Sequence, residues 1–309
     1  MSGDGVKVLL LGAGALGVFF TSKLAAAGAQ TAVVARSDYE TASIHGYEIN
    51  DKGTVCRFRP DFVIRNAAQC PFTPDYLLIT SKILPEVDLK KLTAGVPVSP
   101  STVIVLIQNG IAIEEPVAEI FPRQEILSTV AYLCASRPGP GKIVNTGPGR
   151  LETGSYPAGP PSPAAKRLAE LFIRGGAPCQ VLENIQYARW RKLLWNVPFN
   201  PVSVLAGGAD TGWLCDGAER EKLCRDLMDE VITIAASVGI MLSPREADEM
   251  IAYTKSLKPY NSSMLQDYLT GRPLEVEAIL GNALKIAGRN GISAPRMETC
   301  YALDRKSVV

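Results

Sequence analysis

The sequence is poor in the residues on which several common kinds of site depend. It contains one histidine, His45, and seven cysteines that are scattered through the chain without a C-x-x-C pair. Without paired cysteines or a histidine cluster, the pattern indicates neither a zinc site nor a disulfide framework. Separate cysteines in odd number favour a reducing compartment, so we expect a cytoplasmic protein that holds no metal ion.

Neither one sign of charge nor a long apolar run dominates the 309 residues. There are 32 Lys and Arg against 31 Asp and Glu, which gives a formal net charge of +1 at pH 7. A near-neutral chain does not predict a nucleic-acid partner or a basic membrane surface. No apolar stretch reaches the roughly 20 residues of a membrane span, and the N-terminus has no signal-type segment. We therefore expect a globular protein whose partner is a small molecule.

What the sequence does contain is a glycine motif between a strand and a helix. Residues 6–11 form an apolar, β-prone run, and residues 18–27 have a helical pattern. In G-x-G-x-x-G the first glycine permits a tight turn, the second lets a pyrophosphate approach the backbone, and the third lets the helix pack on the strand. The N–H groups at the start of the helix attract phosphate. We predict a dinucleotide-binding loop made of Gly12, Ala13, Gly14, Ala15, Leu16 and Gly17.

The next predicted strand, residues 31–35, ends at Arg36. In dinucleotide-binding folds an acidic residue about 20 positions beyond the glycines binds the ribose 2′-OH, whereas an arginine there accommodates a 2′-phosphate. Arg36 has that position, and Ser37 offers a second donor. The pattern favours NADP, while the nearby Asp38 keeps NAD open as the alternative.

Polar residues also follow two further predicted strands. The strand at 76–80 is followed by Lys82, and the strand at 102–107 is followed by Gln108 and Asn109. Ligands of an open parallel sheet bind beyond the carboxyl ends of its strands. We therefore expect these side chains to face the nicotinamide end of the cofactor and the substrate, although polar residues are common at strand ends in any case.

The character of the chain changes after residue 182. Residues 41–70 indicate a meander of short strands, whereas the last part of the chain shows long helical patterns at about 186–206, 217–239, 244–256 and 274–290. We predict an α/β protein with a doubly wound, Rossmann-type dinucleotide-binding domain over residues 1–182. An all-helical domain over residues 183–309 would follow it and carry the substrate and catalytic residues.

The first long helical segment carries a polar stripe. Lys192, Asn196 and Asn200 are spaced by four, and steps of four advance only about 40° around a helix. Among apolar neighbours such a stripe is costly unless it faces a ligand or a cleft, the alternative being a solvated face. Pro198 predicts a bend, because it removes one hydrogen bond from the helix.

At this point the motifs resemble those of the ketopantoate reductase (2-dehydropantoate 2-reductase) family over nearly the whole chain. Besides the glycine loop, they are S-K at 81–82, Q-N-G at 108–110, K-L-L-W-N-V-P-F-N-P at 192–201, S-S-M-L-Q-D at 262–267 and P-L-E-V-E at 273–277. The resemblance implies a two-domain reductase of pantothenate biosynthesis. It implies that NADPH reduces the ketone of a branched 2-oxo acid to a 2-hydroxy acid.

The same resemblance implies roles for individual residues. Lys192 would be the general acid, and Glu275 would anchor the substrate, although periodicity alone does not separate Glu275 from Glu277. The chemistry agrees, because hydride addition builds negative charge on the ketone oxygen and an ammonium group can protonate it. The implied substrate contacts are Asn109, Asn196, Asn200 and Ser263, and the implied cofactor contacts outside the glycine loop are Arg36, Lys82 and Asn109.

Three departures from the family pattern bear on the substrate. Gln108 stands where a histidine is common, while Trp195 and Pro198 can reshape the acyl pocket. One alternative is therefore the same scaffold acting on another 2-oxo acid. A second, from a different class, is a non-catalytic NADP-binding sensor, but such a protein would not need the lysine, asparagine, serine and glutamate side chains together. The apolar C-terminal helices can support a homodimer.

Overall fold

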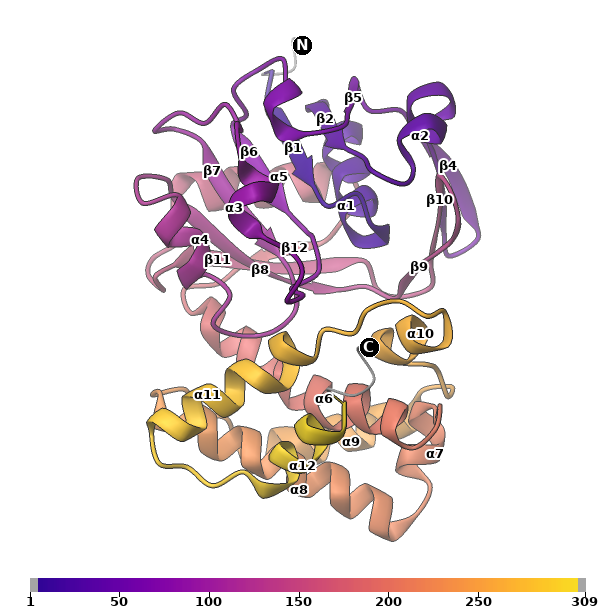
Figure 1. The fold of residues 1–309 in the computed structure, drawn as a ribbon, viewed down its shortest axis with the longest axis vertical. Helices are drawn as coiled ribbons and strands as arrows, with labels where there is room; N and C mark the ends of the chain where they lie inside the picture. The colour runs from indigo at the N-terminus through magenta and orange to yellow at the C-terminus, as the bar shows by residue number, and fades with distance from the viewer. Residues whose placement is uncertain (1–4, 305–309) are drawn as a thin grey trace. The chain divides into compact units, whose positions relative to one another are not determined.

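The computed structural model describes residues 5–304, which divide into two compact units. The first unit consists of residues 5–82, 87–108 and 114–185. The second consists of residues 83–86, 109–113 and 186–304. Two short segments of the N-terminal half are thus grouped with the C-terminal helices, and the chain passes between the units several times. Figure 1 shows the elements of each unit.

An eight-stranded sheet forms the centre of the first unit, in the order β12-β11-β8-β7-β6-β1-β2-β5. Neighbouring strands are parallel except for the antiparallel pair β8 and β11. The four predicted strands are confirmed to within one residue at each end. The bounds are β1 Lys7–Leu11, β2 Gln30–Val34, β5 Phe62–Ile64, β6 Tyr76–Ile79, β7 Val103–Ile107, β8 Ile126–Tyr132, β11 Arg150–Tyr156 and β12 Cys179–Val181.

The central strands are apolar because both faces of the sheet are covered. All five residues of β7 are buried, as expected of a parallel strand with elements on each side. Helices α1 (Ala15–Ala26) and α5 (Pro163–Arg174) pack against one another, with the rings of Phe20 and Phe172 edge to face at 5.9 Å. Ser162 caps α5 by accepting a hydrogen bond from the backbone of Ala165. Short helices α3 (Leu89–Thr93) and α4 (Glu115–Ile120) complete this unit.

The prediction of a strand meander over residues 41–70 was only partly right. The structure has a helix, α2 (Tyr39–His45), before the hairpin of β3 (Tyr47–Asp51) and β4 (Thr54–Phe58). Four of the five residues of β4 are exposed, so this stretch lacks the apolar alternation that marks a half-buried strand. The hairpin joins a second sheet of order β4-β3-β10-β9, with β9 Ala135–Gly139 and β10 Lys142–Asn145, and a 3₁₀ turn, η1, follows at Ala67–Gln69.

The regular elements within the described residues of the second unit are helices, as predicted. Its core is formed by apolar side chains of α6, α8 and α11 around Ile111, which is buried there. The first three predicted helices match within two residues, whereas α7, α10 and α12 were not predicted because their patterns are short. The bounds are α6 Ile185–Leu205, α7 Thr211–Cys215, α8 Ala218–Ser237, α9 Pro244–Ser256, α10 Ser263–Leu269, α11 Asn282–Arg289 and α12 Pro295–Asp304.

The predicted helix at 274–290 begins differently. It opens with a π-helical turn, η2 (Glu277–Gly281), and only then becomes α11. Helix α6 in contrast continues through Pro198 and Pro201. Each proline removes one N–H donor, so the carbonyls of Leu194 and Val197 lose their helical partners. The bend expected at Pro198 stays a prediction.

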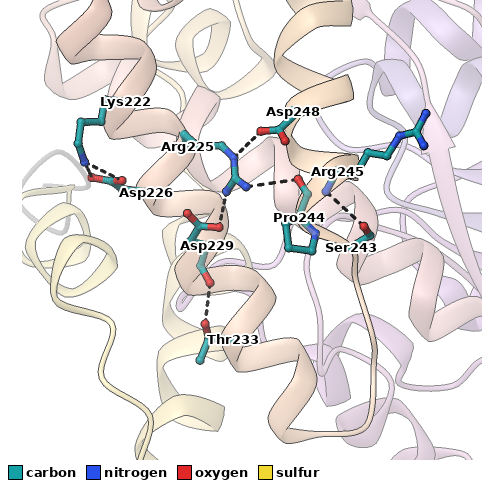
Figure 2. Close-up of polar contacts among 9 residues, drawn as sticks. All are labelled: Lys222, Arg225, Asp226, Asp229, Thr233, Ser243, Pro244, Arg245 and Asp248. Atoms are coloured by element: carbon teal, nitrogen blue, oxygen red, sulfur yellow. Dashed lines mark hydrogen bonds and ion pairs between the residues drawn. The ribbon is translucent and has the colours of Figure 1, made fainter.

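Ion pairs join α8 and α9 on their exposed side (Figure 2). Arg225 lies between Asp229 on its own helix and Asp248 on α9, with Nε 2.7 Å from the Asp248 carboxylate. Its Nη2 also donates to the Pro244 carbonyl at 3.3 Å. Exposed pairs of this kind contribute about 0–1 kcal/mol each, so the buried apolar contacts hold these helices together. Of the helices within residues 5–304, none combines the length and apolar character that a membrane span requires.

Candidate functional site

The glycine loop of the first unit is shaped by the end of β6. Gly12 has a φ of +99°, and a Cβ on it would lie 2.5 Å from the backbone nitrogen of Ser81. A Cβ on Gly17 would lie 2.3 Å from Thr80 Oγ1. The Thr80 hydroxyl donates to the Gly12 carbonyl at 2.6 Å. Both glycines are therefore required by close contacts inside the protein.

Gly14 differs from these two glycines, because a Cβ on it would meet no atom within 4 Å. It is exposed and forms the N-cap of α1, and no side chain of the described residues caps this helix. The first N–H groups of a helix have no intrahelical acceptors, so they are suited to bind an acceptor beside Gly14. Ala13, Ala15 and Leu16 pack against the core and leave backbone groups to line the loop. A loop with this geometry is suited to a dinucleotide pyrophosphate, and Gly14 remains the residue at which we expect its closest approach.

The segment after β2 shows whether the Asp38 carboxylate is available to a ribose 2′-OH, which the sequence left open. Arg36 and Ser37 are exposed, and the Arg36 side chain makes no hydrogen bond or ion pair with the described residues. Asp38 in contrast is only 3% exposed, with Oδ1 3.1 Å from Arg137 Nη1. Its Oδ2 accepts from the backbone N–H of Gly141 at 3.2 Å. Both Asp38 oxygens thus have partners within the protein.

The ends of β6 and β7 lie together in the first unit. Gln108 donates through Nε2 to the Ser81 carbonyl at 2.6 Å, and Lys82 beside it is half-buried. The two strand ends singled out in the sequence are therefore joined by a hydrogen bond. His45 is exposed at the end of α2, far along the chain from these groups.

In the second unit, three predicted site residues are joined by one amide. Lys192 Nζ donates to Asn109 Oδ1 at 2.8 Å, and Asn109 Nδ2 donates to Glu275 Oε2 at 3.3 Å. The backbone N–H of Ile83 donates to Glu275 Oε1 at 3.1 Å. An ammonium requires the amide oxygen and a carboxylate requires the amide nitrogen, so the two partners fix the orientation of Asn109. We call these three residues the Lys192–Asn109–Glu275 cluster.

The segment that carries Asn109 is held by residues that the sequence analysis did not identify. Arg189 is buried and donates through Nη1 to the Gly110 carbonyl at 3.0 Å. Asn282 donates through Nδ2 to the Ile111 carbonyl at 2.9 Å. Arg189 lies one helical turn before Lys192, so its spacing was a signal that it shares the face of the stripe. No sequence signal marked the backbone N–H of Ile83.

The π-helical turn gives Glu275 and Glu277 different positions, a distinction that helical periodicity in the sequence did not provide. Glu277 lies within the turn, where it accepts hydrogen bonds from the Tyr301 hydroxyl and from Lys285 Nζ, the latter at 3.2 Å. Glu275 precedes the turn and belongs to the cluster. Such turns are frequent at functional sites because they change the direction of neighbouring side chains. As a result of the turn, the carboxylates of Glu275 and Glu277 bind different partners.

The amides of the α6 stripe are buried, which excludes the alternative of a solvated face. Asn196 is 4% exposed and Asn200 is 0% exposed. Within residues 5–304, neither the Oδ1 nor the Nδ2 of Asn200 has a hydrogen-bond partner. A buried polar group without a partner costs about 1–3 kcal/mol, and a ligand that binds the amide would remove this cost.

The two adjacent serines at the start of α10, Ser262 and Ser263, have different environments in the structure. Ser262 is buried, caps α10 by accepting from the backbone N–H of Leu265 at 3.2 Å, and lies 3.1 Å from the Ser203 hydroxyl. Ser263, the predicted substrate contact, is exposed in the first turn of α10. The structure therefore gives Ser262 a stabilising position and leaves the Ser263 hydroxyl accessible.

Trp195, the bulky departure from the family pattern, is part of an aromatic stack. Its ring is stacked on Phe199 at 5.0 Å and on Tyr260 at 6.1 Å between centroids. The indole Nε1 donates to Thr254 Oγ1 at 3.1 Å. This hydrogen bond and the two ring contacts fix the Trp195 side chain one turn from Lys192.

Comparisons with known proteins agree with these features. Residues 8–158 match the family "Ketopantoate reductase PanE/ApbA", and residues 184–307 match "Ketopantoate reductase PanE/ApbA C terminal". The chain is similar to a 2-dehydropantoate 2-reductase of Nostoc sp., with 32% identity over 299 residues that cover 96% of this chain and 93% of that protein. It is also similar to the crystal structure of 2-dehydropantoate 2-reductase from Methylococcus capsulatus, with 39% identity, a TM-score of 0.90, and coverage of 97% of this chain and 96% of that one.

A more distant likeness shows the fold alone. The ternary structure of D-mandelate dehydrogenase with NADH and anilino(oxo)acetate has a TM-score of 0.87 at 22% identity, covering 98% of each chain. The matches at higher identity extend over both the sheet-containing and the helical parts of the chain. The chain therefore belongs to the ketopantoate reductase family, whose members among these relatives are oxidoreductases.

Proposed function

We propose that this protein reduces 2-dehydropantoate (ketopantoate) to pantoate with NADPH, as a cytoplasmic enzyme of pantothenate biosynthesis. The observation that carries the proposal is the Asn109 amide, which holds an ammonium and a carboxylate in one hydrogen-bonded cluster. When bound, the cofactor supplies the hydride. The seven free thiols are compatible with a reducing compartment.

Lys192 is the proton donor in this proposal. Its ammonium has three N–H groups, and one is directed to Asn109 Oδ1. A second can donate to the ketone oxygen and stabilise the negative charge that develops there. The proton then passes from Nζ to that oxygen, which gives the 2-hydroxyl group.

Glu275 and the buried amides supply substrate contacts. The Glu275 carboxylate accepts from Asn109 and from the backbone of Ile83, which fixes both oxygens. A substrate hydroxyl can donate to a remaining lone pair of this carboxylate. Asn196 and Asn200 offer amides to the substrate carboxylate or hydroxyl, and the Asn200 amide is buried without another partner among the residues that the structure describes. Ser263 provides an exposed hydroxyl for the same purpose.

The cofactor contacts are assigned to the first unit and to Asn109. The glycine loop would bind the pyrophosphate, Arg36 the 2′-phosphate, and Lys82 the nicotinamide side of the cofactor. Support for NADP over NAD comes from the exposed Arg36 side chain and from Asp38, whose carboxylate is engaged by Arg137 and Gly141.

The test is NADPH oxidation by the purified protein with ketopantoate, followed by the loss of nicotinamide absorbance and run in parallel with NADH. Lys192→Met should lower kcat by about 10²- to 10⁴-fold, the usual contribution of a general acid, while NADPH binding stays unchanged. Lys222→Met is the control, because Lys222 is an exposed residue of α8 paired with Asp226. Near-native turnover by Lys192→Met would refute the assignment of the acid.

The aromatic stack favours one alternative substrate class. Because Trp195 is fixed by Phe199, Tyr260 and Thr254, it does not yield easily to the shape of a substrate. The same reaction on another 2-oxo acid is therefore the second candidate, and a panel of 2-oxo acids tests it. Tight NADPH binding without turnover of any of them would favour the sensor instead. A homodimer is a separate proposal from the apolar C-terminal helices, tested by light scattering.

A further inference from the structure

One arginine far along the chain reaches the residues at the end of β2. Arg137 lies in β9, and its Nη1 is 3.1 Å from Asp38 Oδ1 and 3.3 Å from Ser37 Oγ. The Ser37 hydroxyl is 3.4 Å from the same Asp38 oxygen. All of these residues belong to the first unit. The guanidinium therefore lies directly beside the position where the sequence predicts a 2′-phosphate.

The Arg137 guanidinium has donors beyond those that hold Asp38. A guanidinium carries five N–H groups, and within the described chain only Nη1 of Arg137 makes hydrogen bonds or ion pairs. The side chain is 30% exposed, whereas its partner Asp38 is 3% exposed. The carboxylate is thus covered by protein, and the arginine still faces solvent on one side. This arrangement leaves a positioned cation next to the exposed Arg36 and Ser37.

Asp38 positions this cation. The backbone N–H of Gly141 holds Oδ2, and Oδ1 faces Arg137, so the carboxylate fixes the guanidinium from the buried side. The same contacts engage the carboxylate that a ribose 2′-OH would otherwise use as its acceptor. A phosphate monoester needs several donors and positive charge, and arginine forks match its oxygens. Arg36 alone supplies one fork.

We propose that Arg137 is a second 2′-phosphate-binding residue, which acts with Arg36 and Ser37 and is oriented by Asp38. The inference rests on the NADP preference in the proposed function and names a residue that discriminates NADPH from NADH. Arg137 binds the 2′-phosphate from the β9 side, while Arg36 binds it from the end of β2. A purely structural Arg137, which only neutralises the buried Asp38, is the competing explanation.

The two explanations are separated by calorimetric titration of the full chain with adenosine 2′,5′-bisphosphate (2′,5′-ADP) and with 5′-AMP, which differ only in the 2′-phosphate. Arg137→Gln should weaken 2′,5′-ADP binding by about 10- to 100-fold, the usual effect of losing a hydrogen bond to a charged group. The affinity of this variant for 5′-AMP should change by less than about twofold. Asp38→Asn should retain 2′,5′-ADP binding within about threefold of wild type, because Arg137 remains and the opposing charge is removed.

Arg137→Gln strips a buried carboxylate of its cation, so this variant can unfold for that reason alone. The double variant Asp38→Asn, Arg137→Gln leaves no unpaired charge, and its comparison with Asp38→Asn isolates the contribution of Arg137. Thermal unfolding of each variant checks that the protein is folded. The double variant should bind 2′,5′-ADP about 10-fold or more weakly than Asp38→Asn.

Two other outcomes of the titrations would each contradict one specific part of the proposal. If the wild type prefers 2′,5′-ADP and the double variant matches Asp38→Asn, Arg137 is structural and the proposal fails while the NADP preference stands. If the wild type binds both nucleotides equally, the NADP preference itself fails. Neither readout requires turnover, so an error in the proposed substrate or proton donor does not affect the test.

Discussion

Replacing Gly110 by alanine tests whether the segment that carries Asn109 has to pack against the π-helical turn. Gly110 has a φ of +93°, and a Cβ on it would lie 2.4 Å from the Ala278 carbonyl oxygen. The same Cβ would lie 2.9 Å from both the carbonyl carbon and the Cβ of Ala278. These neighbours are backbone and near-backbone atoms of η2, so no flexible side chain can move aside.

Two costs add in this variant. The left-handed backbone conformation costs an L-residue about 1–2 kcal/mol relative to glycine. Ordinary van der Waals contact requires more than 3.4 Å, so the segment or the turn has to move by about 1 Å, and such overpacking typically costs about 1–3 kcal/mol. The sum is about 2–5 kcal/mol, which lowers Tm by roughly 3–8 °C in a chain of 309 residues. A displacement of Asn109 by about 1 Å would also lower kcat by on the order of 10²-fold.

Gly291→Ala is the matched control. Gly291 also has a positive φ, +66°, but a Cβ on it would meet no atom within 4 Å. It therefore carries the backbone cost alone, and we expect a fall in Tm of roughly 2–3 °C with unchanged turnover. Thermal unfolding and ketopantoate-dependent NADPH oxidation are measured for both variants. Equal melting temperatures would refute the contact with Ala278, and a full kcat in Gly110→Ala would refute the need for a fixed Asn109.

Three further predictions address other parts of the chain. Gly14→Ala should change the melting temperature without ligand by no more than the equivalent of about 1 kcal/mol, but it should weaken NADPH binding about 10-fold. Gly17→Ala should lower the melting temperature even without ligand, because its Cβ would lie 2.3 Å from a side-chain oxygen. Burial raises the pKa of Asp304 from 3.8 to about 6, so the folded state holds the proton more tightly and loses stability as pH rises between these values. Asp304→Asn should therefore stabilise the protein by about 2–3 kcal/mol at pH 7.5 and by little at pH 4, and an equal gain at both pH values would contradict this reasoning. Ser262→Ala should cost about 1 kcal/mol through loss of the helix cap, while Ser263→Ala should leave Tm unchanged and raise KM for the oxo acid.

The central sheet was predictable because its strands are short apolar runs buried on both faces. In β1 and β6, four consecutive residues of each strand are fully buried, so almost every position had to be apolar. Strand β4 and helix α2 gave no such signal, since most of their residues are exposed. Positions exposed to solvent accept almost any polar side chain, so the sequence there lacks the regular apolar pattern that a core requires.

The functional residues also differ in whether a local sequence pattern could predict them. Helical spacing placed Lys192, Asn196 and Asn200 on one face, and the structure buries both amides of this stripe. Periodicity did not distinguish Glu275 from Glu277, because a π-helical turn changes the direction of side chains without leaving a mark in the sequence. Arg137 was not predictable either, since it meets Asp38 through a contact between residues separated by 99 positions.

The Q-N-G motif shows why a continuous motif need not have a single role. Gln108 bonds the Ser81 carbonyl within the first unit, while the next residue, Asn109, bonds Lys192 and Glu275 within the second. Gly110 is required at the third position because the segment packs closely on η2. Three adjacent residues thus meet three physical demands: a strand-end contact, a charge-bridging amide and a close backbone approach. Each demand depends on residues distant in the sequence, so the motif acquires its meaning only from the fold that surrounds it.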